Sequence, residues 1–192
     1  WLRPTAGMNL LDVAGGTGDV AFGFRKAGGV KVTIFDINQQ MVSHGRDRAV
    51  DCGILQGIDW CVGDAEHLPM PDRSVDAYTI AFGLRNVTEP QNALIEACRV
   101  LKPGGRFLCL EFSHVVLPWL ADLYDLYSFN VLPQLGHWIG KDREAYQYLA
   151  ESIRKFPPQK ELASMMQNSG LELVSWRNFT GGVVAIHSGW RL

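Results

Sequence analysis

The first 112 residues alternate between short apolar runs and longer segments in which apolar residues recur at helical spacing. The apolar runs predict strands at 8–13, 31–36, 58–62, 75–81 and 105–112. The intervening segments predict helices at 17–27, 38–52 and 89–99. This alternation favours an α/β fold in which a parallel, doubly wound sheet carries helices on both faces.

The third predicted helix has recognisable signals at both ends. Thr88 and Gln91 have the spacing of a capping box, and Pro90 falls in the first turn. Pro103 and Gly104 end the helix and turn the chain into the next strand.

The pattern changes between residues 115 and 156. Two apolar sets recur there at helical spacing: Leu120, Leu123, Tyr124, Tyr127 and Val131, then Tyr146, Leu149, Ile153 and Phe156. We interpret this segment as a helical insertion. It is followed by a predicted helix at 160–169 and by strands at 172–178 and 183–188, which form a terminal hairpin around residues 180–182. That hairpin would add an antiparallel strand to the sheet.

Composition limits the classes of protein to which the chain can belong. With 192 residues and 47% hydrophobic content, we expect one domain over 1–192. A formal net charge of -2 with scattered basic residues disfavours a nucleic-acid partner. Asp122 and Asp125 interrupt the best apolar run, so we expect a protein that is soluble or peripheral to a membrane. The sequence opens at Trp1 directly before the first strand, so we expect an N-terminal segment to lie outside it.

The cysteines and histidines carry little chemistry by themselves. The four cysteines lack a CxxC spacing, which indicates reduced, structural thiols. His44 and His67 read as surface residues, while His137 and His187 could face a site but are better explained by packing or exposure. Histidine spacing indicates no metal site.

The strand at 8–13 runs into a glycine turn at Gly16 and Gly18, where missing Cβ atoms let the backbone approach a ligand. The next strand ends at Asp36, whose carboxylate would meet a ribose diol. Asp36 could instead cap the following helix, as could Asn38. The loop fits a dinucleotide or S-adenosylmethionine equally well.

Three further features favour S-adenosylmethionine. Asp12 lies inside the first strand, where class I methyltransferases commonly carry an acid near the amino-acid end of the cofactor. Asp64 follows the third strand and could accept a hydrogen bond from the adenine amino group, although a simple turn role competes. The proline-rich segment 68–76 and the terminal hairpin are typical of the same class.

Residues 80–88 and 99–113 resemble the ubiquinone/menaquinone biosynthesis C-methyltransferases, the UbiE-type family of class I S-adenosylmethionine-dependent methyltransferases. The resemblance extends over nearly the whole chain, and Ala14 stands where this family also has alanine. The family's upstream Tyr-Asp-x-Met-Asn and Ser-x-x-x-His segment has no counterpart here. The resemblance implies a Rossmann-like, mostly parallel seven-stranded sheet with an antiparallel C-terminal strand and a helical cap insertion at about 115–156.

The resemblance also implies a site. Its expected cofactor residues are Gly16, Thr17, Gly18, Asp36, Asp64, Ala65 and Ala81. Arg85 and Asn86 would be catalytic, with Arg85 stabilising a phenolate, although a structural ion pair is the alternative role. Tyr124 and Tyr127 of the insertion would contact the substrate.

The implied reaction is C-methylation of a polyprenylated benzoquinol or of demethylmenaquinol. The implied partners are the polyprenyl quinol, a membrane surface, a quinone-biosynthesis complex and a second copy in a homodimer. The protein would be located in the cytoplasm at the inner membrane of a bacterium, or on the matrix side of the inner membrane of a mitochondrion. Three alternatives remain open: a small-molecule O- or N-methyltransferase, a non-catalytic S-adenosylmethionine-binding protein, and a nicotinamide-dependent oxidoreductase.

Overall fold

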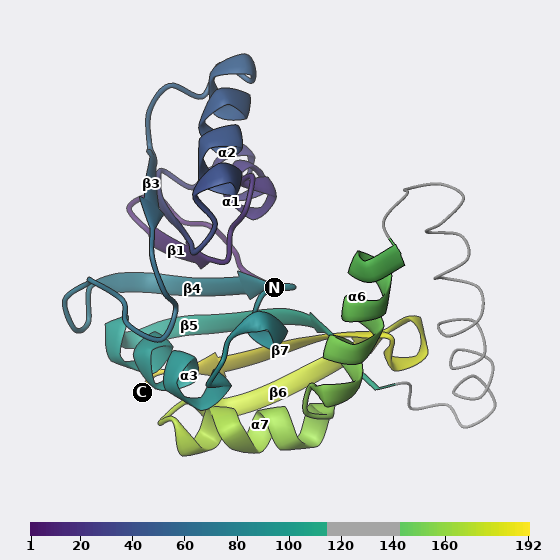
Figure 1. Ribbon diagram of the computed structural model, residues 1–192. Coiled ribbons are helices and arrows are strands. Elements are labelled where there is room, and N and C mark those ends of the chain that lie inside the picture. The colour runs from purple at the N-terminus through teal and green to yellow at the C-terminus, as the bar shows by residue number, and fades with distance from the viewer. Residues whose placement is uncertain (115–142) are drawn as a thin grey trace.

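A computed structural model describes residues 1–114 and 143–192 of the chain (Figure 1). Its central feature is a seven-stranded sheet of order β3-β2-β1-β4-β5-β7-β6. The strands are β1 (Asn9–Val13), β2 (Lys31–Asp36), β3 (Ile58–Val62), β4 (Val75–Ala81), β5 (Leu101–Phe112), β6 (Glu172–Phe179) and β7 (Val184–Trp190). Neighbours pair in parallel from β3 to β5, whereas β7 runs antiparallel to both β5 and β6. The predicted mostly parallel sheet with an antiparallel C-terminal strand is confirmed.

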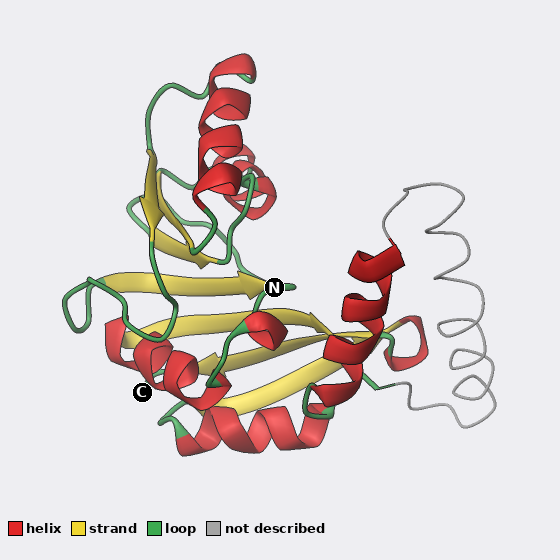
Figure 2. Ribbon diagram, in the orientation of Figure 1, coloured by secondary structure: helices red, strands yellow, loops and turns green. Residues whose placement is uncertain are grey.

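The helices lie around this sheet (Figure 2). They are α1 (Asp19–Lys26), α2 (Gln39–Asp51), α3 (Pro90–Val100), α6 (Arg143–Lys155) and α7 (Gln159–Asn168). Two short 3-10 helices, η1 (Leu84–Asn86) and η3 (Thr180–Gly182), follow β4 and β6. None of the helices in the described ranges is long and apolar enough to cross a membrane.

Alternate residues of the central strands enter two separate cores, because successive side chains of a strand point to opposite faces. Leu10 and Ala77 pack with Phe24 of α1 on one face. Leu11 and Tyr78 pack on the other face, in a larger core that also contains residues of α3 and α7. This double burial explains why the parallel strands read as nearly continuous apolar runs.

Two boundaries near α3 differ from the sequence prediction. The α3 N-cap is Glu89, without a side-chain capping bond, so the predicted capping box is wrong. The side-chain amide of Gln91 instead donates to the Met165 carbonyl of α7, at 3.2 Å. The strand β5 begins at Leu101 rather than 105, and a shift in register opposite β4 between Val75 and Ala77 absorbs the Pro-Gly-Gly segment. Contacts with distant segments, α7 for the helix and β4 for the strand, therefore determine both boundaries.

The helical insertion is described only from Arg143 onward. Its second apolar set falls on α6 and just after it, where Ile153 and Phe156 are buried as predicted. The Nε2 atom of His114, before the insertion, lies 2.9 Å from the carbonyl of Phe156, after it. The two ends of the insertion therefore meet beside the sheet.

Candidate functional site

A cavity of about 470 Å³ opens where the carboxyl ends of β1, β2, β3 and β4 converge. At this edge the chain leaves β1 toward β2 and leaves β4 toward β5, in opposite directions along the sheet. Such a switch point is where open α/β sheets bind ligands. Cavities that enclose small ligands measure roughly 300–1,000 Å³, so this one has an appropriate size.

The glycine loop forms the floor of the cavity through an unusual backbone. Ala14, Gly16 and Gly18 all have positive φ angles, of 51°, 53° and 91°. Alanine in this region costs roughly 1–2 kcal/mol, so the surrounding structure must hold it there. A Cβ atom on Gly83 would lie only 2.2 Å from the Cβ of Ala14. The bare backbone of Gly83 is thus what accommodates Ala14.

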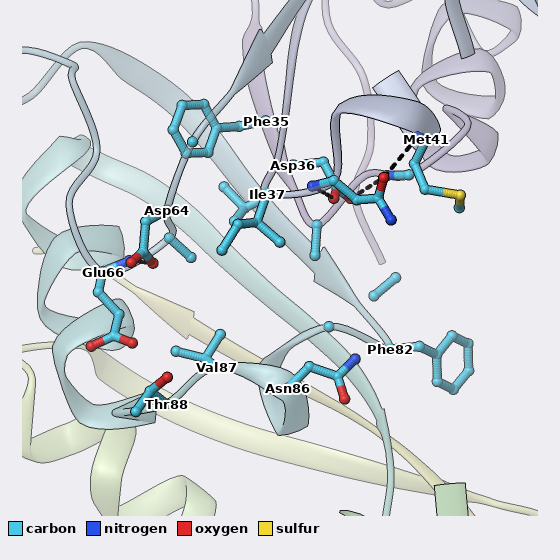
Figure 3. A pocket seen from close by; sticks show the side chains of 18 residues that line it. Phe35, Asp36, Ile37, Met41, Asp64, Glu66, Phe82, Asn86, Val87 and Thr88 are labelled. Carbon is cyan, nitrogen blue, oxygen red and sulfur yellow. Dashed lines mark hydrogen bonds between the residues drawn. The ribbon is translucent and has the colours of Figure 1, made fainter. Parts of the chain in front are cut away.

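Asp36 connects the loop to β2. Its Oδ2 atom accepts the Gly16 N–H at 2.9 Å, and its Oδ1 atom accepts the Asn38 N–H at 2.8 Å. Asn38 is the N-cap of α2 and accepts the N–H groups of Gln40 and Met41. Helix capping therefore belongs to Asn38, which leaves the Asp36 carboxylate at the cavity wall (Figure 3).

The opposite side of the cavity is formed by the turn after β3. Asp64 and Ala65 both line it, and Asp64 Oδ1 accepts the Glu66 N–H at 2.9 Å. The turn role of Asp64 is therefore observed, and its position in the cavity lining leaves the expected bond to an adenine amino group as a prediction. Figure 3 shows Asp64 and Asp36 on either side of Ile37. Cavity and carboxylates fit an adenosine, whose ribose and amino group both donate hydrogen bonds.

Not every expected cofactor residue reaches the cavity. Gly16 and Ala81 line it, but Thr17 and Gly18 do not. The Thr17 hydroxyl accepts from Arg48 at 3.3 Å. Gly18 is enclosed by side chains, with Trp60 3.0 Å from an added Cβ. Within this cavity, their part is to shape the turn into α1.

The sequence prediction missed several apolar wall residues. Ile37 is 74% exposed and lines the cavity directly after Asp36. Phe82 lines it after β4, with a positive φ of 55° and its ring 4.8 Å from that of Phe112. Val87 and Thr88 complete this wall. For Ile37, the available signal was an apolar residue directly after a strand that ends in an acid.

Asp12 lies beneath the loop and does not line the cavity. Its Oδ1 atom accepts the Thr79 hydroxyl at 2.6 Å, while Oδ2 has no hydrogen-bond partner among the described residues. A Cβ on Gly15 would lie 2.9 Å from that Oδ2 atom. Burial raises the pKa of Asp12 to about 7, with Thr79 lowering it and Asp36 raising it further. Its expected role near the amino-acid end of the cofactor stays a prediction, and Asp12 itself lies outside the cavity lining.

Asp12 should make folding stability fall as pH rises. The folded protein holds the Asp12 proton more tightly than the unfolded chain does. The contribution of Asp12 to the free energy of unfolding is therefore greatest below about pH 4 and declines until the pH exceeds about 7. Relative to Asp12→Asn, wild-type stability should drop between pH 5 and pH 8, by at most about 1.4 kcal/mol per pH unit. Urea unfolding at both pH values measures this. Asp59→Asn, at an exposed position of β3, is the control that should follow wild type; a pH-independent gap for Asp12→Asn would refute the assignment.

Arg85 and Asn86 follow β4 in η1 but face different surroundings. Asn86 lines the cavity, whereas Arg85 lines an adjoining hollow against α6. Arg85 Nη1 lies 2.7 Å from Glu111 Oε1, and the Arg85 backbone N–H donates to Oε2 at 3.3 Å. The guanidinium also lies 5.3 Å from the ring of Phe112.

Glu111 is a further residue that sequence analysis missed as part of the site. The side chains of Arg85 and Glu111 are only 11% and 2% exposed. Burial raises the pKa of Glu111, and the Arg85 guanidinium opposes that shift. A charged residue within the apolar run of β5 was the signal. The ion-pair role of Arg85 is therefore observed.

Three further expectations concern tyrosines, histidines and metal ligands. Tyr124, Tyr127 and His137 lie outside the described residues. His187 is buried on β7, with Nε2 3.0 Å from the Gln159 carbonyl and its ring stacked on Trp176, so it does not face the cavity. Among the described residues, no group of three His, Cys, Asp or Glu side chains could hold a metal ion.

Comparison with known proteins identifies the family of the chain and, with it, the cofactor. A family model described as the ubiE/COQ5 methyltransferase family matches residues 2–191. The chain belongs to the ubiE/COQ5 methyltransferase family. It is 55% identical to the ubiquinone/menaquinone biosynthesis C-methyltransferase UbiE of Bartonella tribocorum, over 100% of this chain and 75% of the relative. The protein of the same name from Brucella abortus strain S19 is 54% identical, over 100% of this chain and 73% of the relative.

The solved structures agree in fold. An S-adenosylmethionine-dependent methyltransferase from Mesorhizobium loti superimposes with a TM-score of 0.73 at 15% identity, covering 99% of this chain and 94% of that one. Membership of the ubiE/COQ5 methyltransferase family confirms the expected S-adenosylmethionine-dependent C-methyltransferase. The nicotinamide-dependent alternative is wrong for this chain.

Proposed function

We propose that the chain methylates a ring carbon of a polyprenylated benzoquinol or naphthoquinol, with the reaction taking place beside η1. The observation that carries this proposal is the position of η1 at the cavity wall. It puts the Asn86 amide in the cavity and the Arg85 guanidinium in the adjoining hollow. Asp36 and Asp64 would hold the ribose and adenine of the cofactor.

When bound, S-adenosylmethionine supplies a methyl group on a positively charged sulfur. Asp36 and Asp64 would hold the cofactor, whose chemistry would be donation of this methyl group to the ring carbon, with the sulfonium becoming a neutral thioether. The ring carbon loses its proton to water. An aromatic carbon is nucleophilic enough only when an ortho or para hydroxyl is ionised, so the protein has to favour the phenolate.

Arg85 cannot be the base, because its guanidinium stays protonated. Its fixed positive charge would instead stabilise the phenolate and orient the water that takes the proton. The Arg85 Nε atom is buried without a hydrogen-bond partner among the described residues, so one donor remains for such a water or oxygen. Asn86 would hydrogen-bond a ring oxygen or the cofactor from the cavity wall.

The substrate's polyprenyl tail implies an encounter at a membrane surface. We propose a peripheral contact at the inner membrane, with Tyr124 and Tyr127 of the insertion near the substrate. A homodimer and a quinone-biosynthesis complex are further proposals about partners. We also propose that residues 1–192 form a single domain, because one continuous sheet contains strands from both the first and the last part of the chain.

A turnover assay with mass detection tests the function. Demethoxyquinol or demethylmenaquinol in liposomes should gain a single methyl group, and a tail-less quinol should react less efficiently. Binding of S-adenosylhomocysteine without any methylation would favour the non-catalytic alternative. Methylation of an oxygen or nitrogen would favour the small-molecule methyltransferase. Equal turnover of tailed and tail-less quinols would contradict the membrane encounter.

A further inference from the structure

A tyrosine of α6 contacts the cavity wall from outside the cavity. The Tyr148 hydroxyl donates a hydrogen bond to the Asn86 Oδ1 atom at 3.2 Å, across 62 positions of the chain. Tyr148 lines the hollow that Arg85 also lines, whereas Asn86 lines the cofactor cavity. Asn86 is thus the point at which α6 is linked to the cavity.

This hydrogen bond favours one orientation of the Asn86 amide, because a phenolic hydroxyl is a better donor than acceptor. An asparagine side chain carries an acceptor oxygen and a donor nitrogen, and a flip of the amide exchanges them. With Oδ1 engaged by Tyr148, the Nδ2 group points the other way. Figure 3 shows the Asn86 nitrogen on the side of Phe82 and the oxygen turned away from it. The cavity therefore receives a donor rather than an acceptor.

We propose that Tyr148 is a positioning residue for the methyl-transfer site: its hydroxyl holds the Asn86 amide so that the N–H groups face the bound ligands. The proposal deepens the function proposed above and rests on it for the identity of the substrate. A fixed N–H donor suits an oxygen that bears or develops negative charge, such as a quinol oxygen or a cofactor carboxylate. An amide free to flip would present its oxygen part of the time and repel that charge.

Other features of Tyr148 agree with a role that is separable from folding. Its side chain is exposed, at 59%, so the hydroxyl is not required to satisfy a buried group. The neighbouring Gln147, also exposed, donates to Glu151 at 3.0 Å along the same helix. Gln147→Ala therefore perturbs α6 to a similar extent without touching Asn86.

The experiment is a double-mutant cycle with a direct view of the amide. Tyr148→Phe removes the hydroxyl and keeps the ring. In a proton–nitrogen correlation spectrum, the Asn86 side-chain amide signals, assigned by their loss in Asn86→Ala, should shift or broaden in Tyr148→Phe. They should be unchanged in Gln147→Ala. The melting temperature of Tyr148→Phe should stay at the wild-type value.

The functional arm uses kcat/KM for quinol methylation in the four proteins of the cycle. Tyr148→Phe should lower kcat/KM by about 3- to 10-fold in the wild-type background, as expected for one neutral hydrogen bond, and have no effect in Asn86→Ala. An equal fall in both backgrounds, or unmoved Asn86 signals, would overturn the proposal. If wild type fails to methylate any quinol, the proposed function falls, and the amide signals alone decide the positioning role.

Discussion

Replacing Asp36 with alanine should abolish tight binding of S-adenosylhomocysteine. The carboxylate accepts the N–H groups of Gly16 and Asn38 and lines the cavity at the same time. A hydrogen bond to a charged group contributes about 1.5–3 kcal/mol, so loss of the ribose contact alone raises the Kd by about 10- to 100-fold. The released Gly16 N–H would add to this loss, because the loop that carries it would no longer be fixed to β2.

Calorimetric titration with S-adenosylhomocysteine measures the effect. Asp59→Ala is the matched control, since it removes an exposed carboxylate of β3 that does not line the cavity. It should leave the affinity for S-adenosylhomocysteine unchanged. An Asp36→Ala protein that binds within a few-fold of wild type would show that the ribose is held elsewhere.

Breaking the Arg85–Glu111 pair should produce the largest loss of stability in the site. Both side chains are almost fully buried, and removal of one leaves the other charge without its partner. Such truncations typically cost about 3–5 kcal/mol, so Arg85→Ala and Glu111→Ala should each unfold at markedly lower urea concentration. Loss of turnover in either single variant would therefore not reveal a role for Arg85 in the chemistry.

An apolar replacement of the whole pair separates the two roles. The double variant Arg85→Met with Glu111→Leu should recover most of the lost stability, because well-packed apolar residues often replace a buried ion pair at little cost. It should still bind S-adenosylhomocysteine and fail to methylate the quinol. A stable double variant with wild-type turnover would mean that the charge of Arg85 serves only the fold.

The sheet and the two acids of the cavity were predictable from sequence because local pattern determines them. Asp36 is the last residue of β2, whose apolar residues are buried, and Asp64 follows β3 after one glycine. The glycine loop was harder to assign in detail. Its sequence does not show that Thr17 bonds Arg48 or that Gly18 lies against Trp60, because both contacts come from residues more than 30 positions away.

The other features that the sequence did not predict share one cause, which is contact between distant segments of the chain. The charge of Glu111 within an apolar strand was visible in the sequence, but its partner Arg85, 26 positions earlier, was not. The apparent capping box failed because Gln91 found a partner on α7. Tyr148 fell outside the periodic apolar set of its helix, since it serves a polar contact rather than the core. A charged or polar residue within an apolar pattern should therefore be considered as a candidate for a contact with a distant segment.

The close approach of Ala14 and Gly83 means that two distant loops share room for a single methyl group. That methyl sits on the residue whose backbone pays a conformational penalty, at a φ of 51°. Moving it to position 83 while placing glycine at 14 would conserve volume and relieve the strained backbone. The two positions therefore form one steric unit, in which a side chain can be added at position 83 only after the methyl group at position 14 is removed.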